Sequence, residues 1–215
     1  MGGLTAQLVV GVMALVLAAT AGLVFVHRPW PNRLDVWGYT SLPAEAGAGW
    51  AHDLVTVGSL TGLIVGAMAV LVIGVFRDWV RAVACAVAPV LAVLIVQDLA
   101  KPLVGRHLGI TGAASYPSGT VAAAAALMTA ATLVVPPLVR PLVAVVGAAI
   151  TVGVCAAVIV LRWHFPTDAL GGVAVGLGAV LTVDALFHAP RVLADALSDR
   201  RSDRRVRSSG RPRLA

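Results

Sequence analysis

Long apolar stretches separated by short polar segments dominate the pattern of this chain. A helix that crosses a membrane needs about 20 mostly apolar residues, and a long apolar run without strand-like alternation favours a helix. Six stretches reach or approach that length: 4–26, 54–76, 82–100, 119–135, 141–161 and 168–188. The pattern therefore predicts an all-α fold, a bundle of six transmembrane helices.

The composition supports a membrane protein. The 215 residues are 59% hydrophobic and 12% charged, whereas a soluble domain carries about 25% charged residues. The formal net charge is +6, but eight of the sixteen Lys and Arg residues lie at or after Arg191. The positive charge thus belongs mostly to a tail, which argues against a nucleic-acid-binding face. We expect a membrane domain over 1–189 and a basic, disordered cytoplasmic tail over 190–215, with attachment of that tail to anionic lipids as an alternative.

The distribution of charge predicts the orientation. Six spans place both termini on one side. With the termini inside, the inner segments hold eleven Lys and Arg residues and the outer segments hold five, as the positive-inside rule requires. Frequent Ala, Val and Arg with a single lysine suggest a GC-rich bacterial genome. We therefore expect a multi-pass protein of the bacterial inner membrane with both termini cytoplasmic.

Glycines recur every four residues in two of the stretches. Gly58, Gly62 and Gly66 form one stripe, and Gly172 and Gly176 form another. Small residues at this spacing let helices approach closely. We expect packing within the chain, with a homodimer through these glycine-rich faces as the alternative.

Two connections between the stretches carry polar residues that helix packing does not need. Lys101 is the only lysine in the chain, and Arg106 follows it. Ser118, Gly119 and Thr120 stand where the fourth stretch begins. The N-terminus of a helix offers unpaired N–H groups and a partial positive charge, which suit a phosphate.

The connection before the last stretch contains a histidine and an aspartate four residues apart, His164 and Asp168. Pro166 between them suits a helix start, so Asp168 is expected beside the imidazole, where it orients the ring. Arg162 adds a third cation. Cations, helix N–H groups and an oriented histidine favour phosphoryl transfer. Because the sequence shows no metal-ligand spacing, we expect phosphate-ester cleavage without a metal or other cofactor at the outer membrane surface.

These residues resemble the motifs of the type-2 phosphatidic acid phosphatases, membrane relatives of the vanadium haloperoxidases. That family has Lys, six residues, Arg-Pro; then Pro-Ser-Gly-His; then Ser-Arg, five residues, His, three residues, Asp. The matching residues stand in the same order here, within about 54–188: Lys101; Pro117, Ser118 and Gly119; His164 and Asp168. The resemblance implies that His164 is the nucleophile and Asp168 its partner. It also implies that Lys101, Ser118 and Gly119 hold the phosphate, in a phosphatase core at the outer ends of the helices.

The chain departs from the family pattern at three places. The first-motif Arg-Pro falls at Leu108 and Gly109, and the third-motif Ser-Arg falls at Ala157 and Val158. The second-motif histidine, which protonates the leaving alcohol in the family, is Thr120 here.

Nearby residues offer replacements for the missing groups. Arg106 could reach the same phosphate from its loop. Arg162 would share a face with Val158 if the fifth helix continued that far. His107 is the candidate general acid in place of Thr120, and general acid catalysis is worth about 10²–10⁴-fold. A weak acid would favour diphosphate over monoester substrates, since a phosphate is the better leaving group.

The sequence thus predicts an integral membrane lipid phosphatase acting on a lipid phosphate or a polyprenyl (di)phosphate through a phosphohistidine. One alternative is a catalytically degenerate protein that binds lipid phosphate without hydrolysing it. Another is a small transporter or structural membrane protein, for which Asp184 inside the sixth stretch is the main support. The lipid itself and the oligomeric state stay open.

Overall fold

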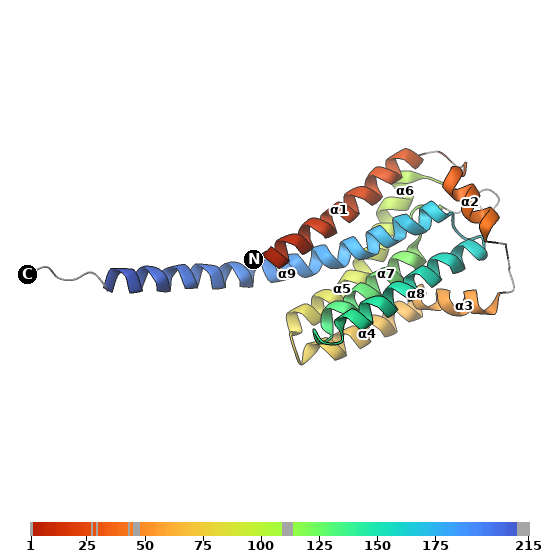
Figure 1. The fold of residues 1–215 in the computed structure, drawn as a ribbon. Helices are drawn as coiled ribbons and strands as arrows, with labels where there is room; N and C mark the ends of the chain where they lie inside the picture. The colour runs from red at the N-terminus through yellow and green to blue at the C-terminus, as the bar shows by residue number, and fades with distance from the viewer. Residues whose placement is uncertain are drawn as a thin grey trace, which may run out of the picture.

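We describe a computed structural model of the chain, which covers residues 2–26, 28, 30–42, 44, 48–108 and 114–209, with side chains as far as Pro190. Within these residues every regular element is a helix (Figure 1). The helices are α1 (Gly2–Phe25), α2 (Arg33–Ser41), α3 (Gly49–Val55), α4 (Leu60–Val75), α5 (Trp79–Leu94), α6 (Lys101–Val104), α7 (Gly119–Val134), α8 (Arg140–Val160) and α9 (Pro166–Ser209). A 3-10 turn, η1 (Thr56–Gly58), follows α3, and a π-helical segment, η2 (Ile95–Ala100), joins α5 to α6.

Among the described residues, four helices are long and apolar enough to cross a membrane: Gly3–Phe25, Trp79–Val104, Arg140–Val160 and Pro166–Pro190. A fifth is added if the bent pair Gly49–Gly58 and Leu60–Val75 is one span. The predicted all-α class is therefore confirmed for the described residues, and four or five helices have the length and composition of membrane spans. The predicted fourth span is the exception, because α7 has only 16 residues. A helix of that length is roughly 24 Å long, less than the hydrocarbon thickness of about 30 Å.

The predicted second span, 54–76, is not one helix. The chain bends by 54° between η1 and α4. Ser59 leaves the helical conformation at this point, and its side chain accepts a hydrogen bond from the N–H of Gly62 at 3.1 Å. Just before it, Gly58 lies against the backbone carbonyl of Thr120. A serine cap and a close backbone contact thus divide an apolar stretch that hydropathy alone reads as continuous.

The predicted third span, 82–100, is longer than expected at both ends. It begins at Trp79, where Asp78 caps the helix by accepting from the N–H groups of Val80 and Arg81. It then continues through η2 and α6 to Val104, where Gly105 ends it with a φ of 59°. Lys101 therefore lies on the helix and not in the loop after it.

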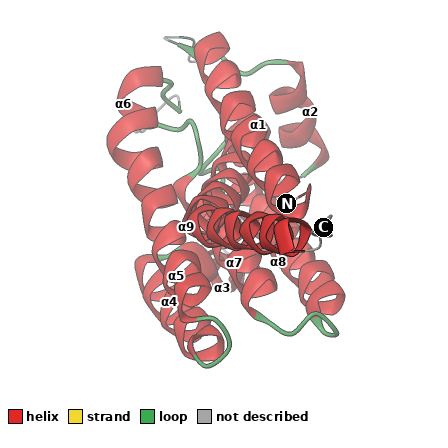
Figure 2. Ribbon diagram, turned by 90° about the vertical axis from the view of Figure 1, so that its left-hand side faces the viewer, coloured by secondary structure: helices red, strands yellow, loops and turns green. Residues whose placement is uncertain are grey.

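The short helix α7 is the centre of the bundle and packs against α4, α5, α8 and α9 (Figure 2). Its alanines at 122–126 are buried, and glycines of neighbouring helices face its backbone. A Cβ added at Gly172 would lie 2.5 Å from the carbonyl oxygen of Ser118, and one at Gly176 would collide with the carbonyl of Ala122. These two glycines serve packing within the chain. A homodimer through the glycine-rich faces stays a prediction.

The last helix passes the boundary expected near residue 189. Helix α9 runs unbroken from Pro166 to Ser209, with Pro190 inside it (Figure 1). Ala, Leu and Arg after this proline are good helix formers, so the backbone over 190–209 is helical where the sequence predicted a disordered tail. Residues 210–215 and the side chains of the basic tail lie outside the described residues.

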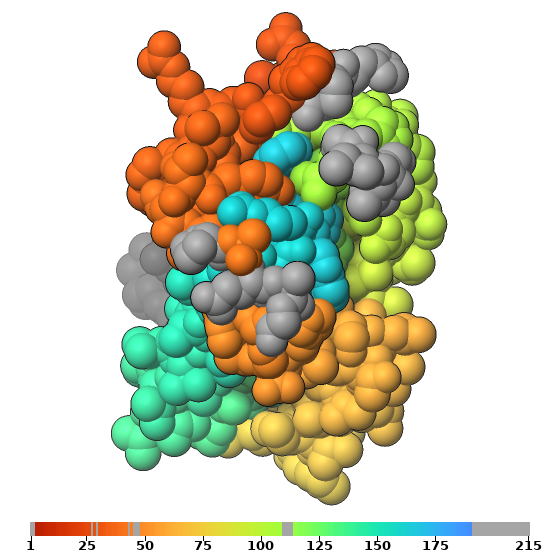
Figure 3. Space-filling model, turned by 90° about the vertical axis from the view of Figure 1, so that its right-hand side faces the viewer, coloured from red at the N-terminus to blue at the C-terminus, as the bar shows by residue number. Residues whose placement is uncertain are grey.

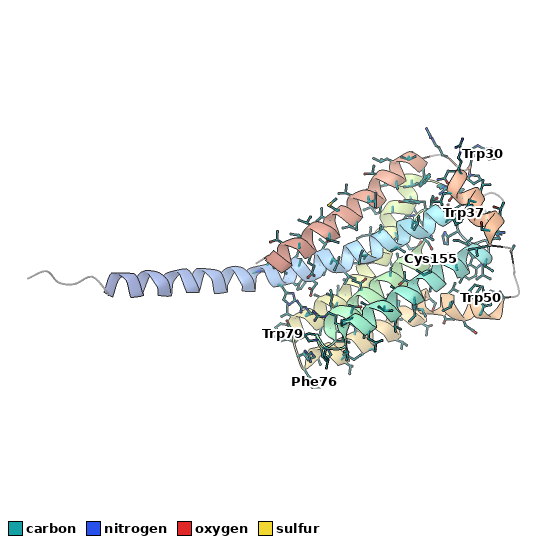
Figure 4. All side chains as sticks on the ribbon, in the orientation of Figure 1. Trp30, Trp37, Trp50, Phe76, Trp79 and Cys155 are labelled. Carbon is teal, nitrogen blue, oxygen red and sulfur yellow. The ribbon has the colours of Figure 1, made fainter. Side chains whose placement is uncertain are left out.

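The bundle has two ends, which we name by what they contain. The site end holds α2, the start of α9 and the described residues between α6 and α7. The turn end holds the α4–α5 turn (76–78) and the α7–α8 turn (135–139). Trp30, Trp37 and Trp50 lie at the site end, and Phe76 and Trp79 lie at the turn end (Figure 4). All five are exposed, as aromatic residues at membrane interfaces commonly are.

Candidate active site

The start of α9 joins two of the predicted motifs directly. Asp168 lies in the first turn of α9 and is fully buried. Its backbone carbonyl accepts a hydrogen bond at 2.9 Å from the N–H of Ser118. Ser118 is the N-cap of α7, and its side-chain oxygen accepts from the N–H of Val121 at 3.4 Å. The beginnings of α7 and α9 are therefore bound to each other, although they are far apart in sequence.

The carboxylate of Asp168 has two hydrogen-bond donors. Its Oδ1 accepts from Nη1 of Arg106 at 2.7 Å, and its Oδ2 accepts from the backbone N–H of Phe165 at 2.9 Å. The second bond is a local N-terminal cap that suits an acid at the positive end of a helix. Two hydrogen bonds thus fix the position of the Asp168 side chain inside the protein.

His164 lies beside this carboxylate. Its Nδ1 is 3.8 Å from Oδ2 of Asp168, which is longer than a hydrogen bond. The same Nδ1 is buried and has no hydrogen-bond partner in the described part of the chain. The imidazole side chain is 11% exposed, so the ring reaches the surface while one nitrogen faces the carboxylate. A small movement of the ring would close the gap to a hydrogen bond.

The end of α8 sets the position of His164. Arg162 has a φ of 58°, a left-handed conformation that is uncommon outside glycine and costs roughly 1–2 kcal/mol. The N–H of Arg162 donates to the carbonyl of Ile159 at 3.0 Å, and the N–H of Trp163 donates to that of Val158 at 2.9 Å. This hydrogen-bonded cap stops α8 at Val160 and turns the chain toward α9. The predicted shared face of Arg162 and Val158 required the fifth helix to continue to residue 162, and the cap ends α8 at Val160 instead.

The side chain of Arg162 points to the end of α2. Its Nη2 donates to the carbonyls of Tyr39 at 2.9 Å and Leu42 at 3.1 Å, and the guanidinium lies 4.2 Å from the centre of the Tyr39 ring. A cation is stabilised at the negative end of a helix. Its Nη1 is buried without a partner in the described residues, so one donor of the predicted phosphate-binding arginine is unused.

Arg106 is buried among acids and aromatic rings. Besides Asp168, its Nη2 binds Asp35 at 2.6 Å and its Nη1 binds the hydroxyl of Thr167 at 2.7 Å. The guanidinium also lies over the rings of Phe25 and Phe165, at 4.3 and 4.5 Å. The side chain predicted to hold phosphate therefore holds two carboxylates in this structure, and binding phosphate would require those ion pairs to open.

The sequence analysis missed Asp35. This residue is fully buried on α2 and also accepts from the N–H and the hydroxyl of Thr167, at 3.0 and 2.8 Å. The local signal is a capping box at the start of α2, in which Asn32 and Asp35 bind each other's backbone N–H. Such a box predicts a helix start, but not a partner 71 positions along the chain.

Lys101 and His107 line a hollow of about 410 Å³ at the site end, together with Gln97, Gly105 and Ala114. Gln97 lies on η2 and was not singled out in the sequence. A Cβ added at Gly119 would lie 2.7 Å from Nε2 of Gln97, so the first residue of α7 adjoins this lining. Lys101 is also within electrostatic reach of Asp168. The π-helical turn that carries Gln97 is a feature often found at functional sites.

The remaining predicted residues lie nearby. His107 is exposed and pairs with Ala114 in an isolated β-bridge. Thr120 is half-buried in the first turn of α7. Figure 3 looks onto this end, where the start of α9 lies between the α2 region and residues 100–108.

Burial raises the pKa of Tyr39 and of Tyr116 to about 12. Both phenols are therefore neutral hydrogen-bond donors at any ordinary pH. The hydroxyl of Tyr39 donates to the carbonyl of His164 at 3.2 Å, and that of Tyr116 donates to the carbonyl of Ala18 at 2.7 Å. These bonds attach α2 to the histidine segment, and the residues before α7 to α1.

In the described part of the chain, no group of three or more His, Cys, Asp or Glu side chains is arranged to hold a metal ion. Comparison of the sequence with protein-family models and with curated proteins, and of the fold with solved structures, finds no match. The candidate site itself offers three features for chemistry. These are a histidine beside a fixed carboxylate, a helix N-terminus, and a hollow lined by a lysine.

Proposed function

We propose that this chain is an integral membrane lipid phosphatase that hydrolyses a lipid phosphate or a polyprenyl (di)phosphate without a metal. The observation that supports it most is the central place of Asp168. Its backbone binds Ser118, its carboxylate lies 3.8 Å from His164, and its charge reaches Lys101. Members of the second and third motifs of the resemblance to the type-2 phosphatidic acid phosphatases thus contact Asp168, and the first-motif Lys101 lies within electrostatic range of it.

The proposed topology has six spans, with both termini cytoplasmic and the site end on the outer face of a bacterial inner membrane. It counts the bent pair α3–α4 as the second crossing and α7 as the fourth. A short crossing is accommodated by local thinning of the bilayer or by flanking residues that reach the interface.

In the proposed substrate complex, the phosphate lies between Lys101 and the N-terminus of α7. Gly119 at that terminus has no side chain of its own, and the amide of Gln97 lies against it and would have to move to admit a ligand. Lys101 supplies the cation, while Arg106 is already bound to Asp35 and Asp168. The assignment of Arg162 to the phosphate rests on its unused Nη1 donor.

The proposed reaction has two steps. First, the lone pair of His164 Nε2 attacks phosphorus, a P–N bond forms, and the P–O bond to the leaving group breaks with its electron pair. The Asp168 carboxylate stabilises the positive charge that develops on the imidazole. Water then attacks the phosphohistidine, the P–N bond breaks, and inorganic phosphate leaves with the free imidazole restored.

The leaving group decides the substrate class. An alkoxide from a monoester needs a proton, which Thr120 cannot supply near neutral pH and which His107 would have to provide. The phosphate leaving group of a diphosphate needs less help. We therefore expect a polyprenyl diphosphate to be hydrolysed faster than phosphatidic acid.

One observation favours a second function, the binding of lipid phosphate without hydrolysis. The carboxylate of Asp168 already accepts from Arg106 and from the N–H of Phe165, and Nδ1 of His164 has no hydrogen bond to any described residue. A histidine that is not tied to its aspartate is a weaker nucleophile. Thr120, which stands where the family has a histidine, also favours binding without hydrolysis, because it cannot protonate the leaving group.

The deciding experiment is phosphate release by the purified full chain in detergent, with EDTA, from phosphatidic acid, phosphatidylglycerol phosphate and a polyprenyl diphosphate. We expect His164→Ala to abolish release. We expect His52→Ala, an exposed histidine on α3, to leave it unchanged. Substrate labelled with ³²P should leave acid-labile label on the wild-type chain and none on His164→Ala.

The outcomes separate the two functions. Release that survives EDTA and requires His164 supports the phosphatase. Absence of release with every lipid, together with binding of lipid phosphate that is lost in Lys101→Ala, would support the non-hydrolysing protein. Release unaffected by His164→Ala would exclude the proposed mechanism.

A further inference from the structure

A second polar hollow lies at the turn end, at the opposite end of the bundle from His164 and Asp168. It has a volume of about 190 Å³ and is lined by residues of the α4–α5 and α7–α8 turns and of the adjoining helix ends. Figure 1 shows these two turns at the same end of the bundle. Arg77, Arg81 and Arg140 line it, together with Asp78 and an apolar wall that includes Pro137. We call it the arginine hollow.

The arginine hollow has an excess of positive charge. Three guanidinium groups line it against one carboxylate, that of Asp78. Asp78 also binds Nε2 of His188 at 3.0 Å, and Arg81 is paired with Asp184 at 3.1 Å. Asp184 balances Arg81, and the carboxylate of Asp78 balances one of the other two arginines. One positive charge therefore remains in excess, so an anion is favoured there.

Arg140 gives the more specific indication. Its Nη2 donates to the carbonyls of Leu133 and Val135 at 3.3 and 3.4 Å, which fixes the guanidinium at the end of α7. Its Nε is buried and has no hydrogen-bond partner in the described residues. An unpaired buried donor is costly, and an anion with several oxygen acceptors in the hollow would satisfy it.

The surroundings place the hollow at the depth of lipid headgroups. Phe76 is 92% exposed and Leu138 is 91% exposed, and each belongs to one of the two turns that form the hollow. Large apolar side chains that project from helix turns are stable where they enter the bilayer surface. A ligand here would meet cations on one side and acyl chains on the other.

We propose that the arginine hollow binds the phosphate of an anionic phospholipid headgroup in the leaflet at the turn end. Free inorganic phosphate shares the anionic chemistry, but it does not use the apolar wall or the exposed Phe76 and Leu138. Basic pockets between membrane helices are a known way to hold anionic headgroups. This inference does not depend on hydrolysis at the site end.

The test is retention of lipid by the full chain, released from mixed phosphatidylglycerol and phosphatidylcholine nanodiscs and measured by native mass spectrometry. We expect preferential retention of phosphatidylglycerol in the wild type. Retention should fall about fivefold for each arginine removed in Arg77→Gln and in Arg77→Gln with Arg140→Gln. Arg140→Lys should retain part of the binding, because it keeps the charge but loses the Nε donor.

The matched control removes two positive charges, as the double variant does, but at the site end of the bundle. Arg28→Gln with Arg33→Gln, both exposed at the site end, should leave phosphatidylglycerol retention at the wild-type value. An equal loss in this control would overturn the proposal, because it would reveal general attraction of a basic protein to anionic lipid. Arg77 is exposed, so its single variant should fold even if Arg140→Gln does not.

A second arm distinguishes the two sources of phosphate. Inorganic phosphate at millimolar concentration should not displace bound phosphatidylglycerol. Displacement by phosphate, or equal retention of phosphatidylcholine, would overturn the assignment to an anionic headgroup.

Discussion

The two ends of the bundle use the same pair of residues in different ways. At the site end His164 precedes Asp168 by four residues, and at the turn end His188 follows Asp184 by four residues. Nδ1 of His188 lies 2.8 Å from the carbonyl oxygen of Asp184, and its Nε2 lies 3.0 Å from Asp78. Nδ1 of His164 has no partner in the described residues. Equal spacing thus places an acceptor within hydrogen-bond distance of both nitrogens of His188, whereas Nδ1 of His164 has none in the described residues.

The aspartates differ as well. Asp168 is bound by Arg106, whose side chain is fully buried, whereas Asp184 is bound by Arg81, whose side chain is 29% exposed. Asp184 also accepts from Gln7 at 2.8 Å. The acid inside the sixth stretch, which was the main sequence support for an ion pathway, is therefore part of a paired polar cluster. A side chain whose hydrogen-bond donors and acceptors all have partners contributes to stability. A side chain with an unpaired donor or acceptor is available to bind a ligand or to react.

The largest expected effect separates the two histidines. His164→Ala should lower phosphate release by at least about 10³-fold and leave the free energy of unfolding nearly unchanged, because it removes a buried nitrogen without a partner. His188→Ala should leave turnover within about twofold but lower the free energy of unfolding by about 1–3 kcal/mol. Phosphate release and denaturant unfolding in detergent micelles measure the two quantities. Equal loss of turnover in both variants would remove the distinction.

The next comparison is between the two arginines. Arg106→Met leaves Asp35 and Asp168 buried without their cation, so the free energy of unfolding should fall by about 3–5 kcal/mol. Arg81→Met should lower it by no more than about 1 kcal/mol, because that side chain is partly exposed and Asp184 keeps Gln7 and His188. Unfolding of both variants in the same micelles checks the ranking. The reverse order would show that the site-end network is not the more buried of the two.

The two aspartates provide a smaller effect on rate. Asp168→Asn removes the anion beside His164, so turnover should fall by about 10²-fold while lipid-phosphate binding persists. Asp184→Asn should leave turnover within about twofold. Steady-state rates and lipid binding separate the two contributions. A similar loss of turnover in both would indicate a general packing defect.

The smallest effect is a pH dependence confined to the site end, where Tyr116 lies. Burial raises its pKa to about 12, above the ordinary value near 10 expected in the unfolded chain. Since the unfolded state loses the proton first, the stability contributed by this group is complete below about pH 10 and is lost as pH rises toward 12. Tyrosinate absorbance at 295 nm should be absent from the folded chain at pH 11. Tyr116→Phe should reduce the alkaline loss of stability, and an unchanged loss would contradict this origin.

The long apolar helices could be predicted because each depends on local composition. The stretches at 4–26 and 141–161 correspond to α1 and α8 within one or two residues. The break at Ser59 could not be predicted, because the close contact that accompanies it involves Gly58 and the carbonyl of Thr120 on another helix. The pattern of apolar residues along the chain does not indicate a contact between residues on different helices.

Some features of the candidate site could likewise be predicted from the sequence, and others could not. His164, Asp168 and Ser118 could be chosen from spacing and helix-start chemistry, and the structure brings them together. The ion pair between Arg106 and Asp35 could not be predicted, because the two residues are 71 positions apart. Gln97 was missed because a single glutamine at the end of an apolar stretch has no spacing that marks it.

The sequence by itself determined an all-helical chain with long apolar helices and the residue types that phosphate chemistry needs, because hydropathy and helix capping act over a few neighbouring residues. Only the tertiary structure decided which polar groups are saturated. It bound Arg106 to two acids, left one nitrogen of His164 without a partner among the described residues, and gathered three arginines around a hollow at the opposite end. Burial and hydrogen-bond partners depend on residues far apart in the chain, and those partners decide whether a side chain stabilises the fold or remains available for a ligand.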